Sequence, residues 1–326
     1  LLMELIRGGL RTDLLTEKPF KEVMDSCFNC KLCLSECPSQ VDIPGLAVAA
    51  RREFVEAKGM PFRNWVLGHS SQVAQVASLA PGIVNLAVGC APERAARESV
   101  GKIAGKLDLP RFRRSLRVGD EGSKRALALP LTPAEPRNGA AVAAIPGSLS
   151  HVPGVSAGGH ARLGPLPPRE VPITKKVAYF AGCFARFHDP EGEAAATIKV
   201  LEANGAEVVV PDQRCCGIAL VTMGAEKKIR GDAERNVRTL LPLVDRGFTI
   251  VASAPSCGLA LIEDYPRILG TEEARRLADH TIDVHQYLCA LHDRGELNTS
   301  FQEVPLTVVY HNACHSVAQG MTEEPV

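Results

Sequence analysis

Four cysteines crowd into one short stretch near the amino-terminal end, and this stretch restricts the fold more than any other feature. Residues 27–38 read Cys-Phe-Asn-Cys-Lys-Leu-Cys-Leu-Ser-Glu-Cys-Pro, so the cysteines are Cys27, Cys30, Cys33 and Cys37. Three thiolates at Cys-x2-Cys-x2-Cys spacing can wrap one corner of a 4Fe–4S cluster, and the proline turns the chain away after the fourth. We therefore predict that these four residues bind a 4Fe–4S cluster.

Zinc is the main alternative for these thiols. Zinc sites usually separate two ligand pairs by a longer loop, and four thiols within 11 residues do not match that spacing. The 326 residues contain no second Cys-x2-Cys-x2-Cys run. Either Cys37 completes the same cluster, or it serves a second cluster whose motif lies outside this sequence.

Charge and cysteine content narrow the function classes. The chain has 37 basic residues (Lys and Arg) and 37 acidic residues (Asp and Glu), so its net charge is zero. A nucleic-acid partner would require an excess of basic residues, and none is present. The 11 cysteines fall mostly in short clusters, a pattern that favours metal-bound thiolates in a reducing cytoplasm over a disulfide framework. The chain starts at Leu1 and stops soon after a cysteine motif, so we expect a fragment of a larger polypeptide.

No window of about twenty apolar residues occurs, which predicts that no helix crosses a membrane. Residues 73–88 come nearest, but Pro81 and Gly82 interrupt them. This stretch predicts a buried helix pair, while peripheral contact with the inner face of the cytoplasmic membrane stays open as an alternative.

The hydrophobic pattern predicts two domains joined by a linker. Residues 1–108 read as helical, with a helix over 1–25 and a second one that Asp42 caps and Gly59 ends. Proline and glycine crowd into residues 109–172, which predicts a linker. Residues 173–326 then alternate between strand and helix patterns.

This alternation predicts an α/β domain with a mostly parallel sheet. The expected strands cover residues 177–181, 207–210, 249–253 and 306–310. The expected helices cover residues 191–204, 224–245, 259–278 and 284–294.

Cysteines follow the expected strands, where ligands collect in parallel sheets. The residues at these strand ends are Cys183, the vicinal pair Cys215 and Cys216, Cys257, and Cys314. Adjacent thiols can bind different irons of one cluster, and the glycine after them lets the backbone approach. We predict a second iron–sulfur or other metal site here, with zinc, or thiols buried as small apolar groups, as alternatives.

The second cysteine group resembles a known family. Cys183, then Cys215-Cys216-Gly217, then Pro255-Ser256-Cys257-Gly258 is similar to the cysteine-rich CCG domain of heterodisulfide reductase. The same domain occurs in the iron–sulfur subunits of glycolate oxidase and anaerobic glycerol-3-phosphate dehydrogenase, and in lactate-utilisation proteins. Family members usually carry two copies, and Tyr310-His311-Asn312-Ala313-Cys314-His315 resembles the opening of a second, truncated one. Residues 24–38 resemble the ferredoxin part of the same proteins.

The resemblance implies an oxidoreductase component, namely an iron–sulfur electron-transfer module of a flavin-linked dehydrogenase. It implies FAD upstream or on a flavoprotein partner that oxidises a small hydroxy acid or glycerol 3-phosphate. The electrons would leave to a quinone or another carrier, and no catalytic residue is expected within this chain. Heterodisulfide reductase has one more cysteine three places after Cys257, where this chain has Ala260. Thiol/disulfide oxidoreduction and a zinc-binding scaffold are the alternative functions.

The remaining cysteines and histidines receive weaker predictions. Cys90 and Cys289 are expected to be packed thiols, and His285 a structural residue. His311 and His315 could tune or bind a metal, or only cap the strand end. No Gly-x-Gly-x-x-Gly follows a strand and no phosphate loop occurs, so no nucleotide site is predicted within these residues.

Overall fold

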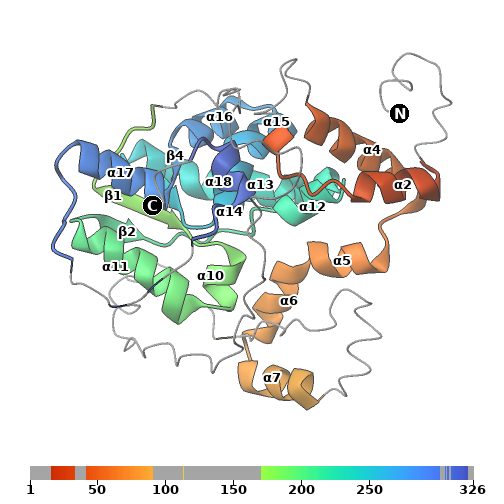
Figure 1. Ribbon diagram of the computed structural model, residues 1–326, viewed down its shortest axis with the longest axis horizontal. Coiled ribbons are helices and arrows are strands. Elements are labelled where there is room, and N and C mark those ends of the chain that lie inside the picture. Colours follow the sequence, from red (N-terminus) through yellow and green to blue (C-terminus); the bar gives the residue numbers. More distant parts are fainter. Residues whose placement is uncertain are drawn as a thin grey trace.

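The chain combines a group of amino-terminal helices with a parallel sheet that is covered by helices on both faces (Figure 1). The computed structural model describes residues 16–33, 42–90, 113, 170–301, 305, 307 and 310–321. The predicted α/β class with a mostly parallel sheet is confirmed. The prediction that residues 1–108 form a ferredoxin-like domain stays a prediction.

The sheet has four strands in the order β2-β1-β3-β4, and each neighbouring pair is parallel. The strands are β1 (Lys176–Phe180), β2 (Glu207–Val209), β3 (Thr249–Ala252) and β4 (Thr281–Asp283). Val177 pairs with Val208 on one side and with Thr249 on the other. Strand β2 lies on one side of β1, and the chain then crosses over to place β3 on the other side. The direction in which strands are added to the sheet therefore reverses between β1 and β3. Ligands of such sheets bind at that switch point.

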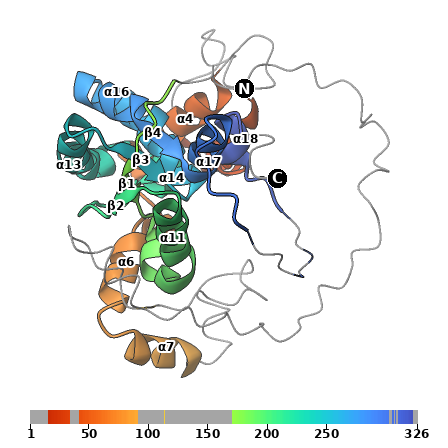
Figure 2. The ribbon, with the colours of Figure 1, turned by 90° about the vertical axis from the view of Figure 1, so that its left-hand side faces the viewer.

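Helices cover both faces of the sheet, as the end-on view in Figure 2 shows. The segments of this domain are α10 (Cys183–Phe187), the π-helix η3 (Pro190–Ala194), α11 (Ala195–Ala203), α12 (Ile218–Thr222), α13 (Glu226–Asp245), α14 (Pro255–Leu259), the π-helix η4 (Ala260–Asp264), α15 (Tyr265–Leu269), α16 (Glu272–Asp279), α17 (Val284–Asp293) and α18 (Cys314–Ala318). One core cluster joins Val177 and Tyr179 of β1 to α11 and α17. The other joins Ala178 and Phe180 to α13, η4 and α16.

The amino-terminal helices are α2 (Lys18–Asp25), α4 (Ile43–Lys58), α5 (Phe62–Gly68), α6 (Ser70–Ala77) and α7 (Pro81–Cys90). The predicted cap is confirmed, because the Asp42 carboxylate accepts a 2.8 Å hydrogen bond from the Gly45 amide. Gly59 ends α4 with φ 78°, as predicted. Helix α2 packs against α4, and α5 and α6 contact α12 and α10.

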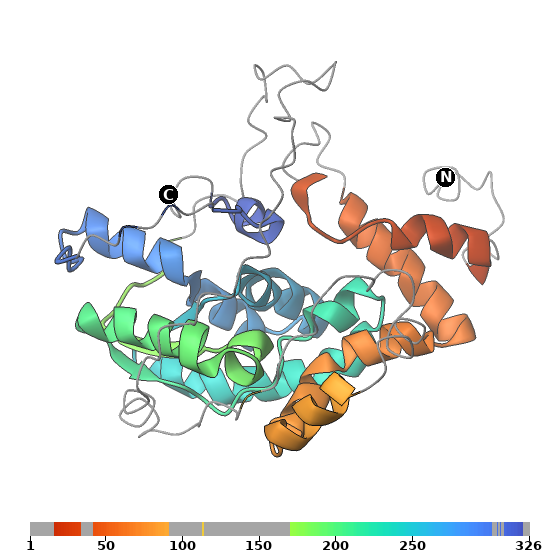
Figure 3. The same ribbon diagram turned by 60° about the horizontal axis from the view of Figure 1, so that its bottom comes forward.

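One glycine allows α4 to touch the sheet domain. Gly224 lies in the turn between α12 and α13 with φ +76°, and a Cβ atom there would lie 2.5 Å from the backbone nitrogen of Arg52. Only glycine accommodates both the left-handed conformation and this approach. The backbone of α4 and the turn at Gly224 are therefore in close contact. Figure 3 shows the amino-terminal helices, in red to orange, beside the sheet domain.

Some elements differ from the predictions or lie outside the described residues. The sequence pattern did not predict β4, which is only three residues long. The strand predicted at 306–310 lies partly outside the described residues, and the described Thr307 and Tyr310 belong to no strand. The fourth strand of the sheet is therefore β4. Residues 1–15, and the predicted linker except for Arg113 and residues 170–172, also lie outside the described residues.

The prediction that residues 73–88 form a buried helix pair is wrong. Helix α6 ends at Ala77 and α7 begins at Pro81. Of the apolar side chains described in this stretch, only the small ones of Ala74 and Ala77 are buried, whereas several large ones lie in solvent. Val76 is 70% exposed, Leu79 81% and Ile83 73%. In the described residues, no helix is long and apolar enough to cross a membrane.

Candidate functional site

The loop from Cys27 to Cys33 has a backbone suited to surrounding an anionic group. Asn29 has φ 53° and Lys31 has φ 61°, so a left-handed residue stands between each pair of successive cysteines. Asparagine tolerates this conformation better than most residues, whereas lysine does not favour it. Backbone with alternating handedness points successive amide groups into a concavity of the kind that binds anions and iron–sulfur clusters.

The three described thiols of this loop lie close enough to influence one another. Burial, followed by the nearby thiols of Cys30 and Cys27, raises the pKa of Cys33. A cation at this place would reverse that effect by stabilising the thiolates. Cys37 lies outside the described residues, so its assignment as the fourth ligand stays a prediction.

The second thiol group lies at the carboxyl edge of the sheet, at the switch point between β1 and β3. Cys183 begins α10, just after β1, and Cys257 lies in α14, just after β3. The pair Cys215 and Cys216 arrives on the loop after β2 and precedes α12. A Cβ atom on Gly182 would lie 3.3 Å from the Cys257 sulfur, which shows how closely the β1 and β3 ends approach. The prediction that strand-end cysteines converge is correct for these four residues.

These four thiols form a continuous hydrogen-bonded group. Hydrogen bonds from Cys183 and Cys216 lower the pKa of Cys215, although burial opposes them. The hydrogen bond to Cys215 is also the largest cause that raises the pKa of Cys183. Hydrogen bonds to Cys215 and Cys257, together with burial, raise the pKa of Cys216. Cys215 is thus the group member most easily present as a thiolate.

Backbone and amide groups hold the vicinal pair in place. Gly217 has φ +80°, and its amide nitrogen lies 3.5 Å from the Cys215 sulfur, which accepts a hydrogen bond from it. Asn236, which is fully buried in α13, accepts a 2.6 Å bond from the Arg214 amide and donates to the Tyr265 hydroxyl at 2.7 Å. Its amide also donates to the Cys215 carbonyl oxygen at 3.4 Å. The loop is therefore fixed on both sides of the two thiols.

A polar pocket of about 180 Å³ opens beside Cys183 and Cys215. Helix α6 supplies Ser71, Gln72 and Gln75 to its wall. Arg186 also lines the pocket, and burial lowers the pKa of its guanidinium. The amino-terminal helices thus complete the surroundings of the second thiol group.

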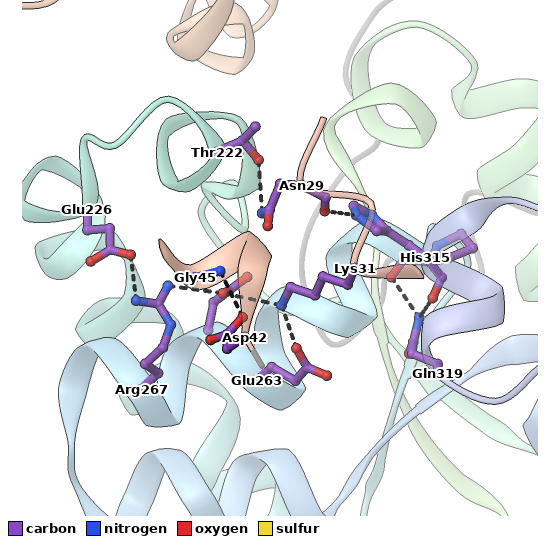
Figure 4. A network of polar contacts seen from close by, with 12 residues as sticks. Asn29, Lys31, Asp42, Gly45, Thr222, Glu226, Glu263, Arg267, His315 and Gln319 are labelled. Carbon is purple, nitrogen blue, oxygen red and sulfur yellow. Dashed lines mark hydrogen bonds and ion pairs between the residues drawn. The ribbon is translucent and has the colours of Figure 1, made fainter. Parts of the chain in front are cut away.

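The loop from Cys27 to Cys33 is anchored on the sheet domain, as the close-up in Figure 4 shows. Asn29 and Lys31 are 2% and 7% exposed, although both residue types usually lie in water. The Lys31 ammonium pairs with Glu263 and lies 3.5 Å from the Asp264 carboxylate. The Asn29 amide donates to the Thr222 hydroxyl at 3.3 Å.

Arg51 of α4 also connects the cysteine loop to the sheet domain. Its guanidinium donates to the Thr222 carbonyl oxygen at 2.6 Å, and to the carbonyl oxygens of Met24 and Cys27. We refer to this set of contacts as the junction. It comprises Asn29, Lys31 and Arg51 on the loop side and Thr222, Glu263, Asp264 and His315 on the sheet side.

The other predicted residues take separate places. Cys314 begins α18, which packs against α14, and it follows no strand in the described residues. His315 contacts both Ser256 and Asn29 and caps no strand within the described residues, whereas His311 is exposed. Cys289 lies part-buried in α17 and takes no part in the four-thiol group. Cys90 ends α7, and its side chain lies outside the described part of the structure.

Sequence reasoning missed the residues that hold the site together. Lys31 and Arg51 resemble ordinary surface charges in the sequence, and Asn236 resembles an ordinary helix residue. The one available signal was position, because Asn29 and Lys31 alternate with the cysteines. Their partners lie far away in the chain, and no local pattern marks such pairs.

The donor atoms fit an iron–sulfur centre, while their arrangement is not that of a finished metal site. Among the residues that the structure describes, no three His, Cys, Asp or Glu side chains form a ready metal-binding group. The four sheet-edge thiols hydrogen-bond to one another instead. Sulfur donors are those that iron–sulfur clusters and zinc prefer, and the Gly217 amide already points at one of them.

Fold and thiol placement define a cysteine-rich domain on a doubly wound parallel sheet. Residues 177–262 match the family model described as a cysteine-rich domain, CCG, and this match includes Cys183, Cys215, Cys216 and Cys257. The predicted resemblance to CCG-domain proteins is thereby confirmed for this part of the chain. No solved structure matches.

Similar proteins extend the likeness beyond this domain. A subunit of the anaerobic glycerol-3-phosphate dehydrogenase of Escherichia coli (strain K12) is 27% identical over 292 residues, which cover 87% of this chain and 61% of that relative. A subunit of the fumarate reductase (CoM/CoB) of Methanothermobacter marburgensis is 32% identical over 46% of this chain and 28% of its own length. The probable glycolate oxidase iron-sulfur subunit of Bacillus subtilis is 28% identical over 44% of this chain and 32% of its own length. This chain thus spans under two thirds of these relatives.

Proposed function

We propose that the chain is an iron–sulfur electron-transfer module of a flavin-linked dehydrogenase. One observation carries the proposal: two separate groups of thiols, one in the loop at residues 27–33 and one at the sheet edge, belong to segments that the junction packs together. A site for substrate chemistry needs one reactive centre, whereas an electron relay needs two centres that are held at a fixed separation. The relatives named as dehydrogenase and oxidase subunits support the same conclusion.

The assignment of ligands follows the two thiol groups. Cys27, Cys30 and Cys33, with Cys37 as the predicted fourth ligand, would hold a 4Fe–4S cluster. Cys183, Cys215, Cys216 and Cys257 would hold a second iron–sulfur centre, while Cys314 lies at the start of a neighbouring helix. Each bound centre would supply one-electron redox chemistry. Binding would replace the hydrogen bonds among the sheet-edge thiols and release their protons.

The chain's own residues then have three tasks. Buried Asn29 and Lys31 keep the loop folded around its thiols and exclude water from its inner side. The amide of Gly217 donates to sulfur, a type of contact that sets the redox potential of thiolate-bound iron. Asn236 holds the backbone of the loop that carries Cys215 and Cys216. The two thiols would therefore already be in position when an iron–sulfur centre binds.

The further parts of the system belong to the same proposal. FAD would reside upstream or on a flavoprotein partner, where a small hydroxy acid or glycerol 3-phosphate loses two electrons. These electrons would pass singly through this module to a quinone or carrier. The domains would be residues 1–108, 109–172 and 173–326. We propose a cytoplasmic location, with peripheral contact at the inner membrane face, which the exposed apolar residues of α6 and α7 support.

Metal analysis of anaerobically prepared protein tests the proposal. We expect iron and acid-labile sulfide, broad visible absorption, and paramagnetic resonance signals after reduction. The substitution Cys30→Ser should remove the signal of the first centre, and Cys257→Ser that of the second. Cys289→Ser serves as the matched control, because Cys289 lies outside both groups, and it should leave both signals intact.

Two outcomes contradict the proposal. Zinc without sulfide at the sheet-edge cysteines would establish the scaffold alternative for that domain. Catalytic reduction of a heterodisulfide by the purified chain would establish thiol/disulfide oxidoreduction instead. Equal loss of signal from Cys30→Ser and Cys289→Ser would show that folding was disturbed, not ligation.

A further inference from the structure

His315 is hydrogen-bonded to both cysteine-bearing segments at once. Its Nε2 atom lies 2.9 Å from the carbonyl oxygen of Asn29, in the loop between Cys27 and Cys30. Its Nδ1 atom lies 2.9 Å from the Ser256 hydroxyl, and Ser256 directly precedes Cys257. The two partners are separated by more than two hundred residues in sequence, and one imidazole ring spans them. Figure 4 shows the contact between His315 and Asn29.

The partners determine how the ring is used. A carbonyl oxygen only accepts hydrogen bonds, so Nε2 must carry the proton and donate to Asn29. In the neutral ring Nδ1 then accepts a hydrogen bond from the Ser256 hydroxyl. Both ring nitrogens are therefore satisfied, and the planar ring fixes the direction in which the loop meets α14.

The helix that carries His315 is itself held on α14. The side-chain amide of Gln319 donates to the Pro255 and His315 carbonyl oxygens, at 2.9 Å each. Gln319 is 8% exposed, and its side-chain oxygen would lie 3.2 Å from a Cβ atom on Gly258. Helix α18 thus cannot move freely with respect to the segment around Cys257.

The other junction contacts act at different elements. Lys31 joins the loop to η4, and Arg51 and Asn29 join it to Thr222 at the end of α12. The hydrogen bonds of His315 lead from the loop to α14. Loss of this ring would leave the loop attached while allowing it to pivot with respect to Cys257.

We propose that His315 is a positioning residue that fixes the cysteine loop at residues 27–33 against the Cys257 segment and so sets the separation of the two thiol sites. It acts through its two hydrogen bonds and takes up or gives off neither a proton nor an electron. This inference rests on the proposed function for its purpose, because a fixed separation matters when electrons pass between the sites. The contact itself does not depend on that function.

The test compares three substitutions in the full chain. His315→Leu removes both hydrogen bonds, and Ser256→Ala removes only the one at Nδ1. His315→Gln keeps a side-chain N–H that can donate to the Asn29 carbonyl oxygen. His285→Leu is the matched control, because His285 is a half-exposed histidine on α17 that bonds Asp283 and not the loop.

The first measurement is amide hydrogen exchange of residues 27–33 in protein without added iron. We expect exchange about tenfold faster in His315→Leu, as the loss of one or two ordinary hydrogen bonds predicts, and wild-type rates in His285→Leu. Ser256→Ala should fall between these two, and His315→Gln should restore most of the protection. Equal rates in wild type and His315→Leu would overturn the inference.

The second measurement uses protein reconstituted with iron and sulfide. Magnetic coupling between the two reduced centres should be present in wild type, lost or weakened in His315→Leu, and restored in His315→Gln, with iron content unchanged. Unchanged coupling in His315→Leu would also overturn the inference. Should wild type bind no iron and sulfide, the proposed function fails, and hydrogen exchange alone decides the role of His315.

Discussion

The Lys31 ammonium lies 3.5 Å from the Asp264 carboxylate, and both side chains are shielded from water, with exposed fractions of 8% and 3%. This pair joins the cysteine loop to the sheet domain. Removal of one partner leaves the other as a buried charge, a loss that generally exceeds the net value of the pair. Arg267 lies 3.2 Å from the same carboxylate and compensates part of the charge.

We therefore expect Lys31→Met to lower the free energy of unfolding by about 3 kcal/mol. Fluorescence of the single tryptophan, Trp65 in α5, reports unfolding of the amino-terminal helices in urea. Lys18→Met is the control, because Lys18 is 85% exposed and 3.9 Å from Glu22, and its change should stay within about 0.5 kcal/mol. Equal small effects would show that Lys31 is not buried in solution.

A pair of glycine substitutions tests the close approach of α4 to the sheet domain. Gly224→Ala places a Cβ atom 2.5 Å from the Arg52 nitrogen at φ +76°, and should destabilise the protein by about 2–3 kcal/mol. Gly231→Ala, within α13 where a Cβ meets nothing within 4 Å, should stabilise it by about 0.5–1 kcal/mol. Urea midpoints followed by circular dichroism measure both. The same sign for the two variants would contradict this packing.

Asn236 offers a test of the vicinal cysteine loop. Asn236→Ala leaves the Arg214 amide and the Tyr265 hydroxyl without their buried partner, and should destabilise the protein by about 2–4 kcal/mol. Cys215 should also react faster with a thiol reagent in protein without bound metal. Tyr265→Phe removes only the hydroxyl, so it should cost about 1 kcal/mol and leave the thiol rate near wild type. Unchanged reactivity in Asn236→Ala would assign the loop's order to other contacts.

The pair of His285 and Asp283 gives stability a defined pH dependence. A 2.9 Å contact with the buried Asp283 carboxylate raises the pKa of His285 above its ordinary value of 6.5. A raised folded-state pKa means that this stabilisation is complete below pH 6.5 and is lost as the pH rises through the folded-state pKa.

His285→Gln should therefore destabilise the protein more at about pH 5.5 than at about pH 8.5. Urea midpoints of wild type and variant at both pH values provide the measurement, and the difference between the two proteins cancels other titrating groups. A larger loss at the higher pH would mean that the carboxylate does not hold the charged imidazole in the folded state.

Local sequence patterns predicted the elements whose signals are local. The caps at Asp42 and Gly59 were readable because a carboxylate at a helix start and a glycine past its end act on neighbouring amides. Strands β1 and β3 were readable because an uninterrupted run of buried, mainly apolar residues follows the first residue of each. Parallel strands bring their carboxyl ends to one edge, so the meeting of Cys183, Cys216 and Cys257 also followed from the pattern.

Burial was less readable from the same patterns. Strand β4 was missed because its three residues are too few for periodicity to register. The apolar run at residues 73–88 predicted burial, yet Leu79 and Ile83 face solvent. An apolar side chain is stabilised by burial against other apolar groups. Whether such groups lie close enough to bury it depends on the packing of the whole chain.

By itself the sequence determined the chemistry of this protein: thiols at cluster spacing near one end, and vicinal thiols after a strand farther along. The tertiary structure alone decided that the two thiol groups are neighbours. Asn29 and His315 are brought together because Arg51 of α4 bonds Thr222 of α12 and because α18 packs on α14. The hydrogen bond between them is worth little until that packing exists. Contacts of this kind link positions that no local pattern connects, because their energy depends on water being excluded from both partners at once.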